Sequence, residues 1–358
     1  MKILAIDLGK FNSEVCVFDR STGEIRFQRI GSDRLFVRRV LEVERPEVVV
    51  FEACTMAGWV FDLCRQLSLR AKVANTSGEA WKFKNLKRKT DRDDAQRLVT
   101  LESMGELPEV RVPPASVRER RSLIAYRQSV VGRRVAVQNQ IRAVFLGQGI
   151  AAPRGHRAWT AAGVEELRRQ ARPLGDCSAG ELWRGQLFEL LEELDGLWRR
   201  LESVEKKLDE LAKADPATLL LETTPGVGRR TAEVVAAYLD DAKRFSNGRE
   251  VSAYSGLVPR QYQSGELDRR GRITRRGPSL LRKLLVEAAW CSLRYNAWAR
   301  DIVARISRGQ RTRKKQAIIA LARKLLVRLW AMLRDGEPWR DGPPDPARAA
   351  ATSMAVQT

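Results

Sequence analysis

Five short apolar runs, each of strand length, punctuate the first 74 residues of this chain. The first three lie at residues 3–6, 15–18 and 25–30, and the turn sequence Ser-Thr-Gly-Glu separates the second from the third. Two further runs, at residues 48–51 and 71–74, alternate with stretches of helical periodicity. This order predicts an antiparallel meander of three strands that continues into alternating helices and strands, and therefore an α/β domain.

Four acidic residues occupy positions in this domain at which they could meet. Asp7 ends the first apolar run, and Glu52 directly follows the fourth, which would place Glu52 at the exposed end of a parallel strand. Asp91 and Asp94 stand three apart at the start of a helix, so one face of its first turn would carry both, with Asp93 pointing elsewhere. Carboxylates that converge in this way repel one another and would be held ionised by bound Mg²⁺. Two such ions about 4 Å apart would activate the attacking oxygen and stabilise the leaving oxygen of a phosphoryl transfer.

Each acid alone also has a structural explanation. Asp7 fits a strand-end turn, Glu52 fits a helix start, and the Asp-Arg-Asp-Asp run fits a helix N-terminus whose dipole favours acids. The joint order of the four acids and the strands favours the metal site. Three meandering strands followed by alternating helices and strands are the order expected of a ribonuclease H-like domain, which we place at residues 1–115.

The charge balance indicates a polyanionic partner. Lysine and arginine number 65 against 44 aspartates and glutamates, a formal net charge of +21, and such an excess usually neutralises phosphates. No stretch approaches the roughly 18 apolar residues of a membrane span, and the amino-terminal sequence lacks the features of a secretion signal. We therefore expect a cytoplasmic prokaryotic protein that acts at the nucleoid, with no membrane partner.

Histidine and cysteine are too sparse for several other chemistries. His156 is the only histidine, which leaves almost nothing for a Ser/His/Asp triad or a histidine-ligated metal, so any metal would be held by oxygen. The five cysteines are scattered without a Cys-x-x-Cys pair, which argues against a zinc knuckle and a disulfide framework. We expect most of them to be small core residues.

The remainder of the chain changes to long, charged, amphipathic helix. Residues 116–215 predict a coiled coil or helical hairpin that acts as a spacer or dimer arm, and residues 216–335 predict a mainly helical domain. Residues 336–358 are rich in Pro, Ala and polar residues and predict a disordered tail. In the second long helix the apolar positions recur every three or four residues: Leu187, Leu190, Leu191, Leu194, Leu197, Leu201, Val204, Leu208 and Leu211.

A Pro-Gly-Val-Gly turn in the third region has the form of a helix-hairpin-helix. Gly226 and Gly228 allow the tight turn, and free backbone N–H groups at the start of the next helix can hold a phosphate. Arg229 and Arg230 add positive charge at that point. A Pro-Gly turn between helices can also be purely structural.

A basic loop follows downstream. It is interleaved with turn glycines and Tyr262, as in a nucleic-acid groove, although basic runs are usually solvated faces. Ser264 opens this loop, and a turn role is its default interpretation, since a nucleophilic serine needs activation and no histidine is near. The candidate phosphate-binding arginines are Arg269, Arg270, Arg272, Arg275 and Arg276, and Arg282 and Lys283 continue the run.

These motifs together resemble the DEDD-type insertion-sequence transposases of the IS110 family, which have a RuvC-like amino-terminal domain and a serine-bearing carboxy-terminal transposase domain. The motifs that carry the resemblance are IDLGK, FEA after an apolar strand, KTDRDDA, PGVG and GLVPRQYQSG followed by GRITRRG. They match in order and approximate spacing up to about residue 335. Where the family commonly has a second glycine and a lysine after the serine-glycine pair, this chain has Glu266 and Leu267.

The resemblance implies roles for particular residues. Asp7, Glu52, Asp91 and Asp94 would be the ligands of Mg²⁺ or Mn²⁺, and Ser264 would be the nucleophile that forms a covalent phosphoserine link to DNA. The resemblance also implies a homo-oligomer, a dimer or tetramer, in which the serine of one subunit completes the metal site of another. Members similar to this chain bind a structured noncoding guide RNA, called a bridge RNA, that pairs with donor and target DNA.

The sequence therefore predicts a DNA recombinase that excises and inserts a mobile element by metal-dependent strand cleavage and serine-linked exchange. Its nearest alternative is a metal-dependent endonuclease similar to a Holliday-junction resolvase, with water as the nucleophile and no role for Ser264. A second alternative is a non-catalytic nucleic-acid-binding protein, which would make the order of the four acids a coincidence.

Overall fold

The computed structural model describes residues 2–75, 90–264 and 267–340. The chain divides into two compact units, Met1–Arg118 and Glu119–Thr358. Within the described residues, no helix combines the length and the apolar character that a membrane crossing needs.

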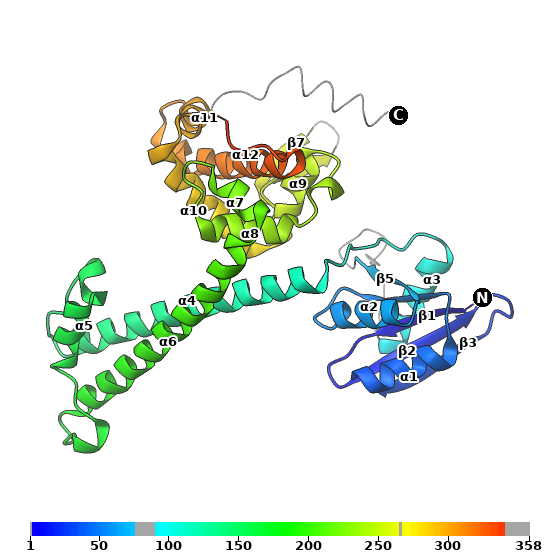
Figure 1. The fold of residues 1–358 in the computed structure, drawn as a ribbon, viewed down its shortest axis with the longest axis horizontal. Coiled ribbons are helices and arrows are strands. Elements are labelled where there is room, and N and C mark those ends of the chain that lie inside the picture. Colours follow the sequence, from blue (N-terminus) through cyan, green and yellow to red (C-terminus); the bar gives the residue numbers. More distant parts are fainter. Residues whose placement is uncertain (1, 76–89, 265–266, 341–358) are drawn as a thin grey trace. The chain divides into compact units, whose positions relative to one another are not determined.

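The first unit is built on a mixed sheet (Figure 1). In the described residues its strand order is β3-β2-β1-β4-β5. The β1–β2 and β2–β3 pairs are antiparallel, whereas β1–β4 and β4–β5 are parallel, so the predicted meander and the parallel strands that follow it are confirmed. The strands are β1 (Lys2–Asp7), β2 (Asn12–Asp19), β3 (Ile25–Gly31), β4 (Val48–Glu52) and β5 (Arg70–Ala74).

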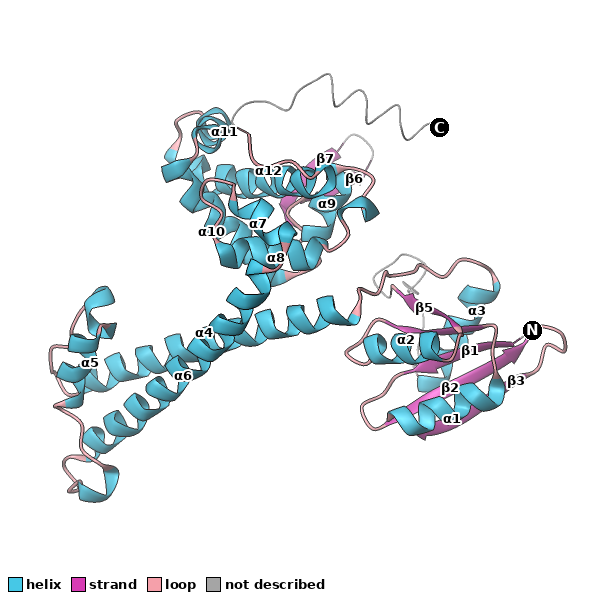
Figure 2. Cartoon of the chain, viewed as in Figure 1, coloured by secondary structure: helices cyan, strands magenta, loops and turns pink. Residues whose placement is uncertain are grey.

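Helices cover both faces of this sheet (Figure 2). Side chains alternate between the two faces of a strand, so Leu4 and Ile6 pack with α1 (Arg34–Glu44) and α2 (Ala57–Gln66). Ile3 and Ala5 face the opposite way, toward α3 (Asp91–Ser103). The alternation along each strand thus decides which polar residues share a face with α3.

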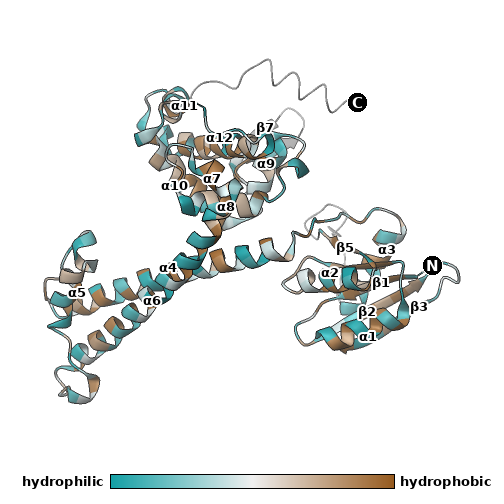
Figure 3. Ribbon diagram, in the orientation of Figure 1, coloured by the Kyte–Doolittle hydropathy of each residue, from teal (hydrophilic) through white to brown (hydrophobic). Residues whose placement is uncertain are grey.

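Two long helices dominate the predicted arm. They are α4 (Ala115–Gly147) and α6 (Leu182–Lys213), with the short elements η2 (Gly155–Trp159), α5 (Ala161–Arg168) and η3 (Leu174–Asp176) between them. Hydrophilic and hydrophobic residues alternate along both long helices (Figure 3). Most of the predicted leucine positions of α6 are buried, and Leu211, at 37% exposure, is the one that the solvent reaches most.

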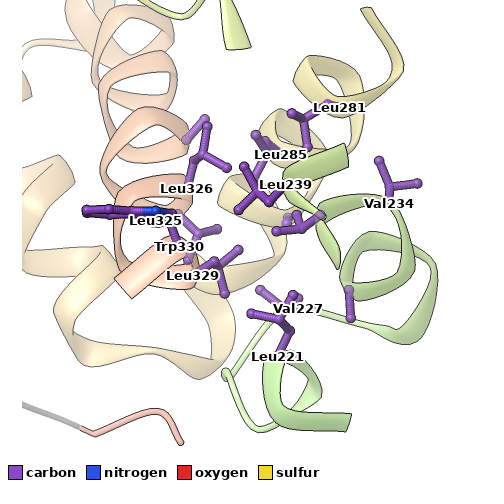
Figure 4. Close-up of a cluster of buried hydrophobic side chains, with 14 of the residues drawn as sticks. Leu221, Val227, Val234, Leu239, Leu281, Leu285, Leu325, Leu326, Leu329 and Trp330 are labelled. Atoms are coloured by element: carbon purple, nitrogen blue, oxygen red, sulfur yellow. The ribbon is translucent and has the colours of Figure 1, made fainter. Parts of the chain in front are cut away.

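The carboxy-terminal part of the second unit is a helical bundle with a two-stranded hairpin. Leu221, Val234, Leu285 and Leu325 come from four different helices and meet in its apolar core (Figure 4). Its elements are α7 (Pro216–Glu222), α8 (Arg229–Leu239), η4 (Ala242–Arg244), α9 (Gly248–Ser255), β6 (Pro259–Ser264), β7 (Leu267–Ile273), α10 (Ser279–Tyr295), α11 (Ala297–Ser307), η5 (Arg311–Arg313) and α12 (Lys314–Asp335).

Two predictions were wrong in part. Cys16 and Cys64 are buried, but Cys54 and Cys291 are exposed, so the core holds a minority of the cysteines. The predicted tail begins too early, because the ring of Trp339 packs 5.4 Å from that of Trp298 and its backbone N–H donates to Thr223 Oγ1 at 3.0 Å. A large aromatic side chain close behind the last helix can fold back onto it, which composition alone does not reveal. Residues 341–358 lie outside the described part of the chain.

Candidate active site and nucleic-acid contacts

Asp7 and Glu52 end two neighbouring parallel strands. Ile6 pairs with Phe51 across β1 and β4, so the next residue of each strand, Asp7 and Glu52, reaches the same edge of the sheet. Ile3 and Ala5 on β1 and Val48 and Val50 on β4 face α3. By alternation, Asp7 and Glu52 lie on that same face. Both are half-buried.

The first turn of α3 presents its three aspartates differently. Thr90 caps the helix, and its hydroxyl lies 2.7 Å from Asp93 Oδ2 and accepts from the Asp93 backbone N–H at 3.2 Å. Asp93 is therefore part of the cap and points away from the sheet, as the sequence predicted. Asp91 is exposed, whereas Asp94 is only 7% exposed and lies 3.8 Å from Arg97 Nη1.

A fifth acid, Glu14, lies on the same face of the sheet and was missed from the sequence. It pairs directly with Asp7 across β1 and β2, and residues opposite each other on antiparallel strands share a face. Glu14 is 9% exposed and accepts a hydrogen bond from Arg92 Nε at 3.1 Å. The available signal was the alternation of Glu14 with the apolar Cys16 and Phe18 along β2, which places Glu14 on the face of the sheet that α3 covers.

These contacts fix α3 over the sheet at both ends. Arg92 holds the first turn to Glu14 on β2, and near the other end Glu102 accepts from Lys72 Nζ of β5 at 2.8 Å. The turn that carries Asp91 and Asp94 is therefore tied to the strand position opposite Asp7.

The donor chemistry of these residues fits a divalent cation. Carboxylate oxygens are the ligands that Mg²⁺ and Mn²⁺ prefer, and the strand ends with the α3 turn supply them from one side of the sheet. In residues 2–75, 90–264 and 267–340, no group of three or more His, Cys, Asp or Glu side chains is already close enough to hold a metal ion. These carboxylates are ligands of the kind that Mg²⁺ prefers and lie on one side of the sheet. In the described residues they are not grouped closely enough to hold a metal ion.

The Pro-Gly-Val-Gly turn at residues 225–228 lies between α7 and α8. Gly226 has a φ of +90°, and a Cβ there would lie 2.5 Å from Ser292 Cα. Arg229 Nε donates to Glu222 at 2.8 Å, and Arg230 donates to the buried Glu233 at 2.8 Å. Both arginines also reach Asp209. Their charge is therefore balanced by neighbouring carboxylates within the bundle.

Ser264 is the last residue of β6 and pairs with Leu267 of β7, so the predicted basic loop contains a β-hairpin. Gly265 and Glu266 lie outside the described residues. Arg269 and Arg270 belong to β7 and pair with Tyr262 and Gln261 of β6.

Three further candidate arginines, Arg272, Arg275 and Arg276, are exposed at the base of this hairpin. Arg282 has a structural role there, because its Nη1 donates to the carbonyls of Ser255, Arg276 and Gly277. A groove beside it is lined by Leu257, Ile273, Arg275, Ser279, Arg282, Lys283, Val286 and Glu287.

Comparison with known proteins identifies similar sequences along nearly the whole chain. The family model described as "Transposase IS116/IS110/IS902 family" matches residues 218–304, and a model for DEDD transposases of the IS110 type, described as "Transposase", matches residues 4–148. A "Probable family 20 transposase" of Pseudomonas aeruginosa is 30% identical over 345 residues, 95% of this chain and 98% of its own length. The "Transposase for insertion sequence element IS1111A" of Coxiella burnetii is 28% identical, over 96% of this chain and 92% of its own. The "Pilin gene-inverting protein" of Moraxella lacunata is 35% identical over 123 residues, 34% of this chain and 38% of its own.

Proposed function

This chain belongs to the IS110 family of DNA transposases, and from that premise we propose that it excises and inserts an insertion-sequence element through a covalent phosphoserine–DNA intermediate. The observation that carries the proposal is the common face of the sheet shared by Asp7, Glu52 and the first turn of α3. The relative named for pilin-gene inversion supports recombination over simple hydrolysis.

Asp7, Glu52, Asp91 and Asp94 would hold the divalent cation in this proposal. When bound, the cation would offset the negative charge that builds up on the scissile phosphate. Asp7 and Glu52 are positioned by parallel strands, and Asp94 by a helix tied down at both ends. Rigid secondary structure is what a metal-dependent phosphoryl transfer needs, because small displacements of a ligand reduce the rate strongly.

Ser264 would supply the attacking hydroxyl from the hairpin. Its Oγ would form a bond to phosphorus while one phosphorus–oxygen bond to deoxyribose breaks, and the departing oxygen takes up a proton to become a hydroxyl. The serine proton would pass to a carboxylate, because the sole histidine, His156, lies exposed on η2 in the arm. The resemblance to the family supports a serine from one subunit acting with the carboxylates of another.

Positive charge supports the proposed partners. The formal net charge of +21 suits both DNA and a structured guide RNA, whose base pairing would select the sites while the protein contacts backbones. Arg272, Arg275 and Arg276, exposed at the hairpin base, would hold the strand near Ser264. Arg229 and Arg230 could contribute to phosphate binding only by exchanging their present carboxylate partners.

The test is detection of a covalent protein–DNA adduct on a denaturing gel. Purified protein, Mg²⁺, RNA transcribed from the flanks of the gene and DNA carrying the element junction would be combined. The wild type should form the adduct, and Ser264→Ala and Asp7→Asn should not. Ser279→Ala is a matched control, because this exposed serine lines the nearby groove. Cleavage without an adduct that survives Ser264→Ala would instead establish a resolvase-like endonuclease.

A further inference from the structure

Six exposed cations gather where α11, η5 and α12 meet. No acidic residue occurs between positions 302 and 334 of the chain. The elements contact one another and α10, so these cations form one surface, which we call the α11–α12 basic surface. Its cations are Arg305, Arg308, Arg311, Arg313, Lys314 and Lys315.

These cations have no carboxylate partner in the part of the chain that the structure describes. None of the six takes part in an ion pair with another described residue, and Lys314 Nζ lies over the ring of Trp290. Arg229 and Arg230 differ, since each is paired with two carboxylates. The first turn of α12 holds no acid, and cations at that end of a helix oppose the helix dipole. The arrangement therefore costs stability unless an external anion approaches.

Exposed aromatic rings accompany the charges. Trp290 on α10 is 42% exposed, and Lys314 Nζ lies 5.4 Å from its ring centroid. Tyr295, at the end of α10, is 67% exposed. Aromatic faces beside closely spaced cations are the combination that binds single strands, because bases stack on the rings while cations hold the phosphates.

We propose that the α11–α12 basic surface binds single-stranded nucleic acid, with Trp290 stacking on an unpaired base. All six cations lie beyond residue 304, where the matched transposase region ends, and the surface is separate in sequence from Ser264 and the carboxylates. The inference shares with the proposed function only the premise that nucleic acid is the partner. DNA and RNA strands offer the same phosphates and stacking faces, and the test separates them.

The binding test uses fluorescence anisotropy of the full-length protein with labelled single-stranded DNA, single-stranded RNA and duplex DNA of one sequence, over a range of salt concentrations. In the variant Arg308→Gln/Arg311→Gln/Arg313→Gln/Lys315→Gln, single-strand affinity should fall at least tenfold at moderate salt. The slope of log affinity against log salt should become shallower by about 3, because each phosphate that the variant no longer neutralises reduces the slope by roughly 0.7. The single strand, DNA or RNA, whose affinity falls most in this variant is the one that the α11–α12 basic surface binds.

A matched control removes four exposed charges from the arm, by Arg199→Gln/Arg200→Gln/Lys206→Gln/Lys207→Gln on α6. It should leave the salt slope nearly unchanged. Trp290→Leu should weaken single-strand binding roughly 5- to 100-fold without weakening duplex binding, and Trp290→Phe should restore most of the loss. Circular dichroism and melting curves would verify that each variant is folded.

Two results would overturn the inference: equal losses in the two quadruple variants, or unchanged single-strand affinity in Trp290→Leu. Failure of the proposed function would give a different pattern of results from failure of this inference. Ser264→Ala should bind single strands like the wild type even if no adduct ever forms. Conversely, adduct formation by the wild type together with equal losses in the two quadruple variants would support the proposed function and refute this inference.

Discussion

At the scale of single residues, Asp93 and Asp94 are adjacent and carry the same charge, but their surroundings differ. Asp93 bonds with the capping Thr90, whereas Asp94 is buried on the sheet side of α3. Asp94→Asn should lower strand cleavage by at least about 100-fold, since a ligand of the cation contributes several kcal/mol of charge stabilisation. Asp93→Asn, which removes the same charge one residue away, should retain most activity in the same cleavage assay. Equal losses would contradict the assignment.

Glu14 is expected to position α3 through Arg92. The ion pair itself should add little stability, because the Arg92 side chain is 69% exposed. Glu14→Gln should nevertheless lower cleavage about tenfold and raise the Mg²⁺ concentration needed for half-maximal rate, as loss of an outer partner of a metal site does. Rates would be measured across a Mg²⁺ titration.

The control for this pair is a double-mutant cycle with Arg92→Gln. If the two residues act through one contact, the double variant should be no slower than the slower single variant. If the effects of the two substitutions on rate are additive, or if the melting temperature drops strongly, Glu14 does not act through its contact with Arg92.

At the scale of elements, the α7–α8 turn depends on Gly226. Its φ of +90° and the 2.5 Å approach of a Cβ to Ser292 Cα leave no room for a side chain. Gly226→Ala should lower the free energy of unfolding by about 3 kcal/mol or more, from backbone strain and overpacking. Gly228→Ala, at an N-cap with open space around it, should cost about 1 kcal/mol or less. Urea unfolding would measure both.

Asp215 joins α4 to α7. Burial raises the pKa of its carboxyl, but hydrogen bonds from Thr218 and Arg120, at 2.5 and 2.6 Å, outweigh burial and bring the pKa below its usual 3.8. A lowered folded-state pKa means that the ionised carboxyl stabilises the fold above pH 3.8, and that this stability is lost as the pH falls through the folded-state pKa.

Asp215→Asn should therefore lower the free energy of unfolding by about 1–2 kcal/mol at neutral pH. The loss should be the same at pH 7 and pH 5 and should shrink only below pH 3.8. Denaturant unfolding of both proteins at these values would check it. If the difference in free energy of unfolding between the two proteins shrinks between pH 7 and pH 5, a titratable group other than Asp215 is responsible.

At the scale of the whole molecule, the net charge of +21 should oppose folding through self-repulsion. Raising sodium chloride from about 50 to 300 mM should therefore increase the melting temperature by roughly 2–5 °C, for 1–2 kcal/mol of repulsion screened. Potassium acetate at equal ionic strength should act alike if screening is the cause. A fall in melting temperature would mean that the ion pairs outweigh the repulsion.

Local sequence patterns were sufficient for the antiparallel meander, the strands and helices that follow it and the start of α3, whereas the metal-binding roles of Asp7, Glu52, Asp91 and Asp94 stay predictions. Period-two and period-3.6 patterns are set by neighbouring residues, so β1, β4 and α3 appear where predicted. The short α11, at residues 297–307, was not predicted, and Asn296 caps it directly after α10.

What the sequence by itself determined is the order of strands and helices in the first unit and which residues carry the charge. The tertiary structure alone decided how they are partnered. Strand register places Glu14 opposite Asp7. Arg229 forms an ion pair with Glu222 of α7, and Arg230 forms one with Asp209 of α6. Trp339 packs against Trp298. Periodicity depends on adjacent residues, whereas register and ion pairing depend on segments far apart in the chain, which come together only when the apolar faces pack.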